Sequence, residues 1–234
     1  MTTTNNDSLR TSPSTRTRAL WPLWGLPAGL LGFIATVFLN ARPPAESKTD
    51  GYTVTPDDMP TLDVGSYHLA VVLGYISVMC LLVFAAEWRR RVERRFEHST
   101  GAAVVTLGLV ASAGGLTLAY GWMGALSRYL PSAPEGSTYD NQGTFVYFML
   151  TDFSPYIAWL GVLLAGGALA WMAFRERLVS RALGAFTGAV FVAILAFVFI
   201  TGVPGAPGIA GLVWAIASVW LALGRSAVTR TSDA

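Results

Sequence analysis

Polar side chains that could do chemistry gather at one end of three apolar segments of the chain. A histidine close to two carboxylates takes up a proton more readily, because the negative charges favour its cationic form. If the three segments pack side by side, their ends form one polar pocket suited to pH sensing or cation binding. Alternatively, these groups simply face water and lipid headgroups. The candidates are Asp63, Tyr67, His68, Arg128, Asp152 and Tyr156.

Two of these segment ends share a pattern that suggests an internal repeat. Asp63 and Tyr67 have the same spacing as Asp152 and Tyr156, and both apolar segments end in an arginine-rich turn. Two hairpins related by an axis along the membrane normal would produce this pattern. Any pair of membrane hairpins with outer acids and inner arginines would produce it as well, so both interpretations stay open.

A second cluster is basic and lies between two apolar segments. Basic side chains at a membrane surface attract anionic lipids by about 1 kcal/mol each. The same run also orients a chain in the membrane, and Glu87, Glu93 and Glu97 dilute its charge. Contact with anionic lipid and a purely orienting role are therefore both open. The residues are Arg89, Arg90, Arg91, Arg94 and Arg95.

Other chemistry finds little support in the sequence. His68 begins the second expected span at the outer face and His98 precedes the third at the inner face, so about 30 Å of hydrocarbon separates them and they cannot share a metal ion. Cys80, the single cysteine, lies in mid-segment without a base beside it. Metalloprotease, hydrolase and nucleotide-binding motifs do not occur. We therefore expect no catalytic residue, no metal and no cofactor.

Composition predicts an integral membrane protein. Of the 234 residues, 53% are hydrophobic and 13% are charged, against about 25% charged in a typical soluble domain. The net charge of +2 is too small for a protein that binds nucleic acid electrostatically. The partner that composition indicates is the lipid bilayer.

Gaps between charged residues predict an all-α bundle of six transmembrane helices within residues 19–224. Four gaps hold 22 to 30 residues each, enough for one helix of about 20 residues. The fifth, 182–224, holds 43 and is interrupted by glycines and prolines at 202–208, so it folds into two spans. The expected spans are 19–40, 67–88, 101–122, 155–174, 182–202 and 207–224.

The distribution of basic residues predicts that both termini are cytoplasmic. With six spans, the tails 1–18 and 225–234 share one side with loops 87–98 and 175–181, and this side carries 13 of the 16 basic residues. Basic residues favour the cytoplasmic side. Loops 41–66 and 123–154 are then the two long outer loops. We expect the tail 1–18 to be disordered, because it has almost nothing apolar to bury.

The remaining patterns indicate packing and membrane position. Small residues one turn apart, as at Gly161 and Ala165, let helices approach closely, and we expect them to pack inside the bundle. Tyr67 and Trp159 are expected at the outer interface, which amphipathic rings prefer. The basic start of the first span would also suit a signal peptide, but its apolar stretch is longer than the usual 7–15 residues.

Three functions remain from the sequence. The first is a non-enzymatic accessory or assembly subunit that contacts a membrane-protein partner through its acidic outer loops. The second is a transporter or channel for a small solute, lined by hydroxyl groups. The third is a membrane-embedded enzyme with a site at the outer face. Fifteen arginines against one lysine indicate a GC-rich bacterial genome and hence the inner (plasma) membrane.

Overall fold

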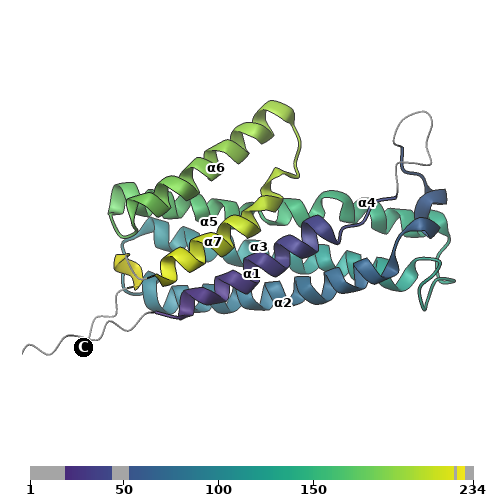
Figure 1. The fold of residues 1–234 in the computed structure, drawn as a ribbon, viewed down its shortest axis with the longest axis horizontal. Coiled ribbons are helices and arrows are strands. Elements are labelled where there is room, and N and C mark those ends of the chain that lie inside the picture. Colours follow the sequence, from purple (N-terminus) through teal and green to yellow (C-terminus); the bar gives the residue numbers. More distant parts are fainter. Residues whose placement is uncertain (1–18, 44–52, 224–225, 230–234) are drawn as a thin grey trace, which may run out of the picture.

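The computed structural model describes residues 19–43, 53–223 and 226–229, and this part of the chain is helical without strands. Long α-helices alternate with short 3-10 and π-helical turns, and most of them run along one long axis (Figure 1). In chain order the elements are η1 (Trp21–Trp24), α1 (Gly25–Phe33), η2 (Ile34–Phe38), η4 (Pro56–Thr61), α2 (Val64–Trp88), η5 (Arg89–Glu93), α3 (Thr100–Tyr129), α4 (Asn141–Ala158), α5 (Leu160–Trp171), η6 (Met172–Glu176), α6 (Arg181–Thr201), η7 (Ala206–Ile209), α7 (Ala210–Ala222) and η8 (Ala227–Thr229).

Five helical stretches are long and apolar enough to cross a membrane. The all-α, membrane-type architecture expected from the sequence is therefore confirmed. A further apolar stretch, Ala206–Ala222, is shorter than the other five, so length alone supports five crossings rather than six. The five are Trp21–Phe38, Val64–Glu93, Thr100–Tyr129, Asn141–Glu176 and Arg181–Thr201.

Most of the expected outer loop 123–154 is helical instead. α3 continues to Tyr129 and α4 begins after Asp140, whose carboxylate accepts a hydrogen bond from the Gly143 N–H at 2.8 Å. Phe148 is 6% exposed, within the hydrophobic core. The apolar run that looked too short to span a membrane is thus the start of a longer helix, stabilised by a cap and by packing on α3.

The other expected loops are also shorter than predicted. Loop 41–66 contains η4, and α2 begins at Val64. The π-helical turns η5 and η6 extend the preceding helices into the expected loops 87–98 and 175–181. Charge gaps locate the hydrocarbon, but a helix can continue past its edge wherever caps and tertiary contacts satisfy the backbone.

Part of the C-terminal tail 225–234 packs against the bundle. Within residues 226–229, the Ala227 N–H donates to the Leu178 carbonyl at 3.0 Å, which ties this segment to the loop before α6. The expected disordered tail 1–18 lies outside the described residues.

Helices approach one another through small residues, as the sequence predicted. A Cβ added to Gly108 in α3 would lie 2.4 Å from the carbonyl oxygen of Gly161 in α5, and one on Gly161 would lie 2.2 Å from the oxygen of Gly108. Between α1 and α7, a Cβ on Gly29 would lie 2.2 Å from the Gly211 oxygen. Backbones this close require glycine, so these residues serve packing within the chain.

α6 leaves the bundle toward its C-terminal end (Figure 1). Near its start it packs on α5, where a Cβ added to Gly184 would lie 2.2 Å from the Ala173 Cβ. Towards its end, Phe199 is 85% and Ile200 is 83% exposed. Only 22% of the apolar stretch of α6 is buried, against 44–50% for the other four long stretches.

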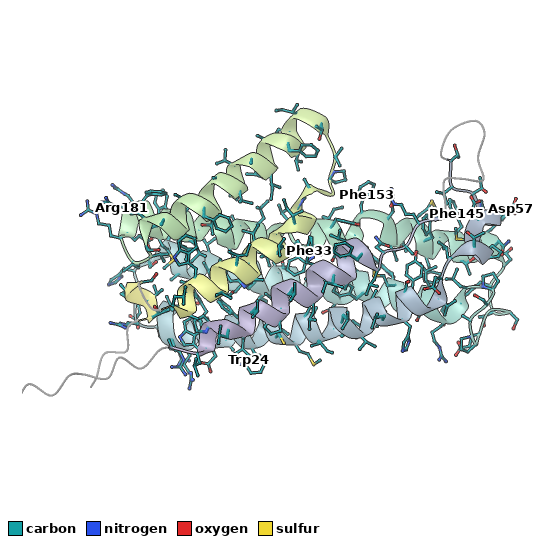
Figure 2. The ribbon with its side chains drawn as sticks, viewed as in Figure 1. Trp24, Phe33, Asp57, Phe145, Phe153 and Arg181 are labelled. Carbon is teal, nitrogen blue, oxygen red and sulfur yellow. The ribbon has the colours of Figure 1, made fainter. Side chains whose placement is uncertain are left out.

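The two ends of the bundle differ. At one end α2, α3 and α4 continue past the ends of α1, α6 and α7 (Figure 1); we call η4, residues 123–140 and α4 up to Asp152 the far lobe. Figure 2 shows Asp57 and Phe145 in this lobe and Arg181 at the opposite end, which we call the arginine end. The 36 residues from α4 to η6 extend about 54 Å, well beyond about 30 Å of hydrocarbon.

Candidate functional site

The segment that follows the first span joins α2 to α4 at the base of the far lobe. The Tyr67 hydroxyl donates to the Ala41 carbonyl at 2.7 Å. The side-chain amide of Asn40 donates to the Thr151 carbonyl at 3.0 Å. Tyr67 is fully buried: its hydroxyl bonds to this carbonyl and its ring packs in the core.

Two of the other predicted pocket residues lie at the same junction. Arg42 forms an ion pair with Asp152 of α4, and Asn40, Arg42 and Asp152 lie near the Tyr156 hydroxyl. The structure therefore brings Tyr67, Asp152 and Tyr156 together through residues 40–42. Sequence reasoning missed Asn40 and Arg42, although a polar pair directly after an apolar span was a usable signal.

A cavity of about 330 Å³ opens beside the Arg42–Asp152 pair. Its polar end is this ion pair, whose side chains are 51% and 31% exposed, and the rest of its wall is apolar. Such a site can hold a polar group by hydrogen bonds while an apolar part rests on aromatic rings. The lining residues are Arg42, Val54, Phe145, Phe148, Met149 and Asp152.

Asp63 has a structural role at the start of α2. Its carboxylate accepts hydrogen bonds from the Ser66 hydroxyl at 2.6 Å, from the Ser66 N–H at 2.8 Å and from the Gly65 N–H at 3.2 Å. These bonds, that of the Ser66 hydroxyl first, lower the pKa of Asp63 below its ordinary value. The group is thus a charged helix cap at neutral pH and a poor proton acceptor.

Asp63, His68 and Arg128 are not joined to the junction. Arg128 pairs with Glu135 beyond the end of α3, and His68 is exposed. The similarity between the Asp63 and Asp152 patterns ends here too, since Asp63 caps a helix whereas Asp152 lies inside α4. Among the described residues there is no group of three histidines, cysteines or acids that could hold a metal ion.

The five arginines of the basic cluster divide into two sets. Arg90 and Arg91 both pair with Glu87, and the guanidinium of Arg95 lies 5.3 Å from the centre of the Phe96 ring. Arg89 and Arg94 are exposed, and in the part of the chain that the structure describes they form no ion pair.

A buried polar cluster that the sequence did not predict links α1, α3 and the α4–α5 break. The Trp159 indole N–H donates to the Thr36 hydroxyl at 3.1 Å, and that hydroxyl lies 3.0 Å from the Tyr120 hydroxyl. Tyr120 donates to the Gly32 carbonyl at 3.1 Å. Trp159 is fully buried, and its polar N–H has a partner inside the bundle.

The hydroxyl groups expected to line a path in a solute transporter form hydrogen bonds within the protein. Those of Thr117, Thr187 and Thr201 donate to the carbonyl four residues earlier. The others bind neighbouring elements: Ser77 donates to the Ala28 carbonyl, Thr106 donates to Glu93, and Ser112 accepts from the Val162 N–H.

Comparison with known protein families, with curated proteins and with solved structures finds no match to this chain.

Proposed function

We propose that the chain is a non-enzymatic accessory subunit of a bacterial plasma membrane, with six crossings and both termini in the cytoplasm. It binds a helix of a partner membrane protein along one exposed face of α4 and α5. The observation that carries this proposal is an apolar stripe that continues from the bilayer into the far lobe.

The sixth crossing is η7 with α7. Its 17 residues extend about 27 Å, because the 3-10 turn has the longer rise per residue, and this approaches the thickness of the hydrocarbon. α7 packs along α1, with Gly29 and Gly211 at the contact. Because α1 belongs to a long apolar stretch and α7 lies along it, we expect α7 to cross the bilayer beside α1.

The proposed orientation predicts which cysteines react from outside the cell. Ser137 in the far lobe and His98 at the arginine end are both exposed. Ser137→Cys is expected to react with a membrane-impermeant maleimide in intact cells, whereas His98→Cys reacts only after permeabilisation. The unmodified chain is the control, because its single cysteine, Cys80, is buried. Reaction of His98→Cys alone in intact cells would reverse the orientation.

The proposed contact surface is a stripe of exposed apolar side chains, which we call the α4–α5 seam. Its members follow one another at alternating spacings of four and three residues, the repeat that helices use to pack side by side. They are 37–50% exposed. They are Val146, Leu150, Phe153, Ile157, Leu160 and Leu164.

Lipid accounts for only part of this seam. Counting back about 20 residues from Trp171, an exposed tryptophan at the arginine end, sets the outer edge of the hydrocarbon near Asp152. Val146 and Leu150 then lie outside it, where exposed apolar patches indicate protein contacts. Because the seam continues into the bilayer, an occupant that covers all of it is a transmembrane helix that extends past the membrane surface.

The divergence of α6 supports the same surface. α6 covers α5 near Gly167, where an added Cβ would lie 3.0 Å from the Phe191 ring. Beyond that point Leu164 and Leu160 are 45% and 49% exposed. The partner helix would occupy the space that α6 leaves open on α5.

The acidic outer residues are less suited to this role than the sequence suggested. Of the six acidic outer residues that the structure describes, Asp57 is exposed, three cap helical turns and two form ion pairs, so the charges of these five are already engaged within the chain. They are Asp58, Asp63, Asp140, Glu135 and Asp152.

A mild-detergent purification of the tagged protein, quantified by mass spectrometry, tests the proposal. We expect one membrane protein at a stoichiometric ratio, and at least about a tenfold lower recovery with Leu150→Glu, because a buried unpaired carboxylate is costly. The matched control is Leu69→Glu, which changes an exposed leucine at the start of α2 and should leave recovery unchanged.

Two outcomes contradict the proposal. Equal recovery with both variants would mean that the partner does not use the seam. A particle without any stoichiometric partner would remove the accessory role itself.

A further inference from the structure

A groove at the arginine end lies between the end of α2 and the start of α3. Its volume is about 410 Å³, within the range of about 300–1,000 Å³ that is common for small-molecule sites. One end is basic and the other is apolar. The lining residues are Leu82, Ala85, Ala86, Arg89, Arg90, Arg94, Thr106 and Val110.

The π-helical turn η5 brings the basic residues of this groove together. In an α-helix, residues five apart point about 140° away from each other. Here the Arg94 N–H donates to the Arg89 carbonyl at 3.1 Å, a bond five residues back that widens the turn. Arg89 and Arg94 therefore line the same groove. Turns of this type occur often at functional sites.

The charges at the groove leave two arginines for a ligand. Glu87 is occupied by Arg90 and Arg91, and Glu93 accepts a hydrogen bond from Thr106 at 2.5 Å. Arg89 and Arg94 form no ion pair within the described residues. A guanidinium binds phosphate oxygens through two parallel hydrogen bonds, so this pair is suited to a phosphate group.

The apolar end of the groove lies within the long apolar stretches of α2 and α3. Leu82 and Val110 are 44% and 49% exposed, and the small side chains of Ala85 and Ala86 line the same apolar floor of the groove. Leu82, Ala85 and Ala86 precede the arginines along α2, so the surface changes from apolar to basic toward the end of this helix. That order matches a phospholipid, with its acyl chains in the hydrocarbon and its phosphate at the surface.

We propose that this groove binds an anionic phospholipid, with the phosphate between Arg89 and Arg94 and the upper acyl chain on Leu82, Ala86 and Val110. A soluble anion would use only the basic end. The apolar floor, open to lipid, favours the membrane source. Arg90 strengthens the local positive potential while it stays paired with Glu87.

Native mass spectrometry of the full chain tests this site. The detergent contains equal amounts of phosphatidylglycerol and phosphatidylcholine with identical acyl chains, and the lipid adducts of the released protein are counted. We expect phosphatidylglycerol adducts to exceed phosphatidylcholine adducts by at least about tenfold. Arg89→Gln combined with Arg94→Gln should bring the ratio close to one.

Two further variants separate a specific groove from general attraction. Arg175→Gln combined with Arg181→Gln removes the same charge from exposed positions at the same end and should keep the preference. Ala86→Trp fills the apolar floor without a change of charge and should lower phosphatidylglycerol retention at least about fivefold, since the acyl chain loses its surface.

The proposal is overturned by any of three results. They are equal retention of the two lipids by the unmodified chain, an equal loss of preference in both double variants, and full displacement of phosphatidylglycerol by millimolar inorganic phosphate. The last result would identify a soluble anion as the ligand. The lipid measurements do not depend on the proposed partner of the α4–α5 seam: if that partner does not exist, the lipid preference of the unmodified chain and of its variants is expected to be the same.

Discussion

Gly108→Ala is expected to destabilise the folded protein by about 3 kcal/mol, near the upper end of typical overpacking costs. The added Cβ would lie 2.4 Å from the Gly161 carbonyl oxygen, a backbone atom that cannot rotate away. α3 and α5 would have to separate, and the neighbouring bond from the Val162 N–H to Ser112 would be strained.

This loss can be measured with the chain's own cysteine. Cys80 is buried, so a thiol-reactive fluorophore reports unfolding as the detergent-solubilised protein is heated. The control on the same helix is Gly114→Ala, where an added Cβ meets no atom within 4 Å. That change should be neutral, or stabilising by up to about 1 kcal/mol through helix propensity. Equal unfolding temperatures for the two variants would contradict the close approach of α3 and α5.

Trp159→Ala is expected to cost about 3–5 kcal/mol, the usual range for removing a large buried aromatic side chain. The ring fills the space between α1 and α7: a Cβ on Gly32 would lie 2.4 Å from it, and one on Gly211 would lie 3.1 Å from it. Its loss also removes the hydrogen bond to Thr36.

Two companion variants show whether burial is the cause. Trp159→Phe keeps most of the ring and leaves the Thr36–Tyr120 contact in place, so it should cost clearly less than Trp159→Ala. Trp24→Ala, at a tryptophan that is 46% exposed, should change the unfolding temperature little. The same cysteine-reactivity measurement checks all three. An equal loss for Trp24 and Trp159 would mean that Trp159 acts only as an interfacial anchor.

The sequence located helices better than it located sites. Asp63 and Asp152 look alike in the sequence, yet one caps α2 and the other pairs with Arg42 from inside α4. A carboxylate can cap a helix only where it stands beside the free N–H groups of the first turn. Because α4 starts at Asn141 rather than near residue 155, Asp152 lies inside the helix and has no such groups beside it. The 3.6-residue period gave no sign of this start, because the run 144–150 is apolar on all sides.

The arginine groove shows the same limit. Five arginines between residues 89 and 95 indicated a basic membrane surface, but the sequence left open which of them pair with acidic side chains. Glu87 forms ion pairs with two of them, and the π-helical turn aligns Arg89 with Arg94. The pairs with Glu87 have the i,i+3 and i,i+4 spacing of a helix. The alignment of Arg89 with Arg94 does not follow from spacing, because a standard helical turn would direct these two side chains apart.

Membrane character and the approximate positions of the helices were determined by the sequence itself. Moving a charged residue into hydrocarbon costs about 2.5–3.5 kcal/mol on insertion scales. Because this cost does not depend on which helices pack together, the gaps between charges predict the apolar helices without knowledge of their contacts. Pairing between distant residues was decided only by the tertiary structure. Which helices meet decides the contact of Trp159 with Thr36, the contact of Gly108 with Gly161 and the opening left by α6. In a bilayer, an apolar helix surface gains little from one partner over another, and only close packing and hydrogen bonds distinguish the partners.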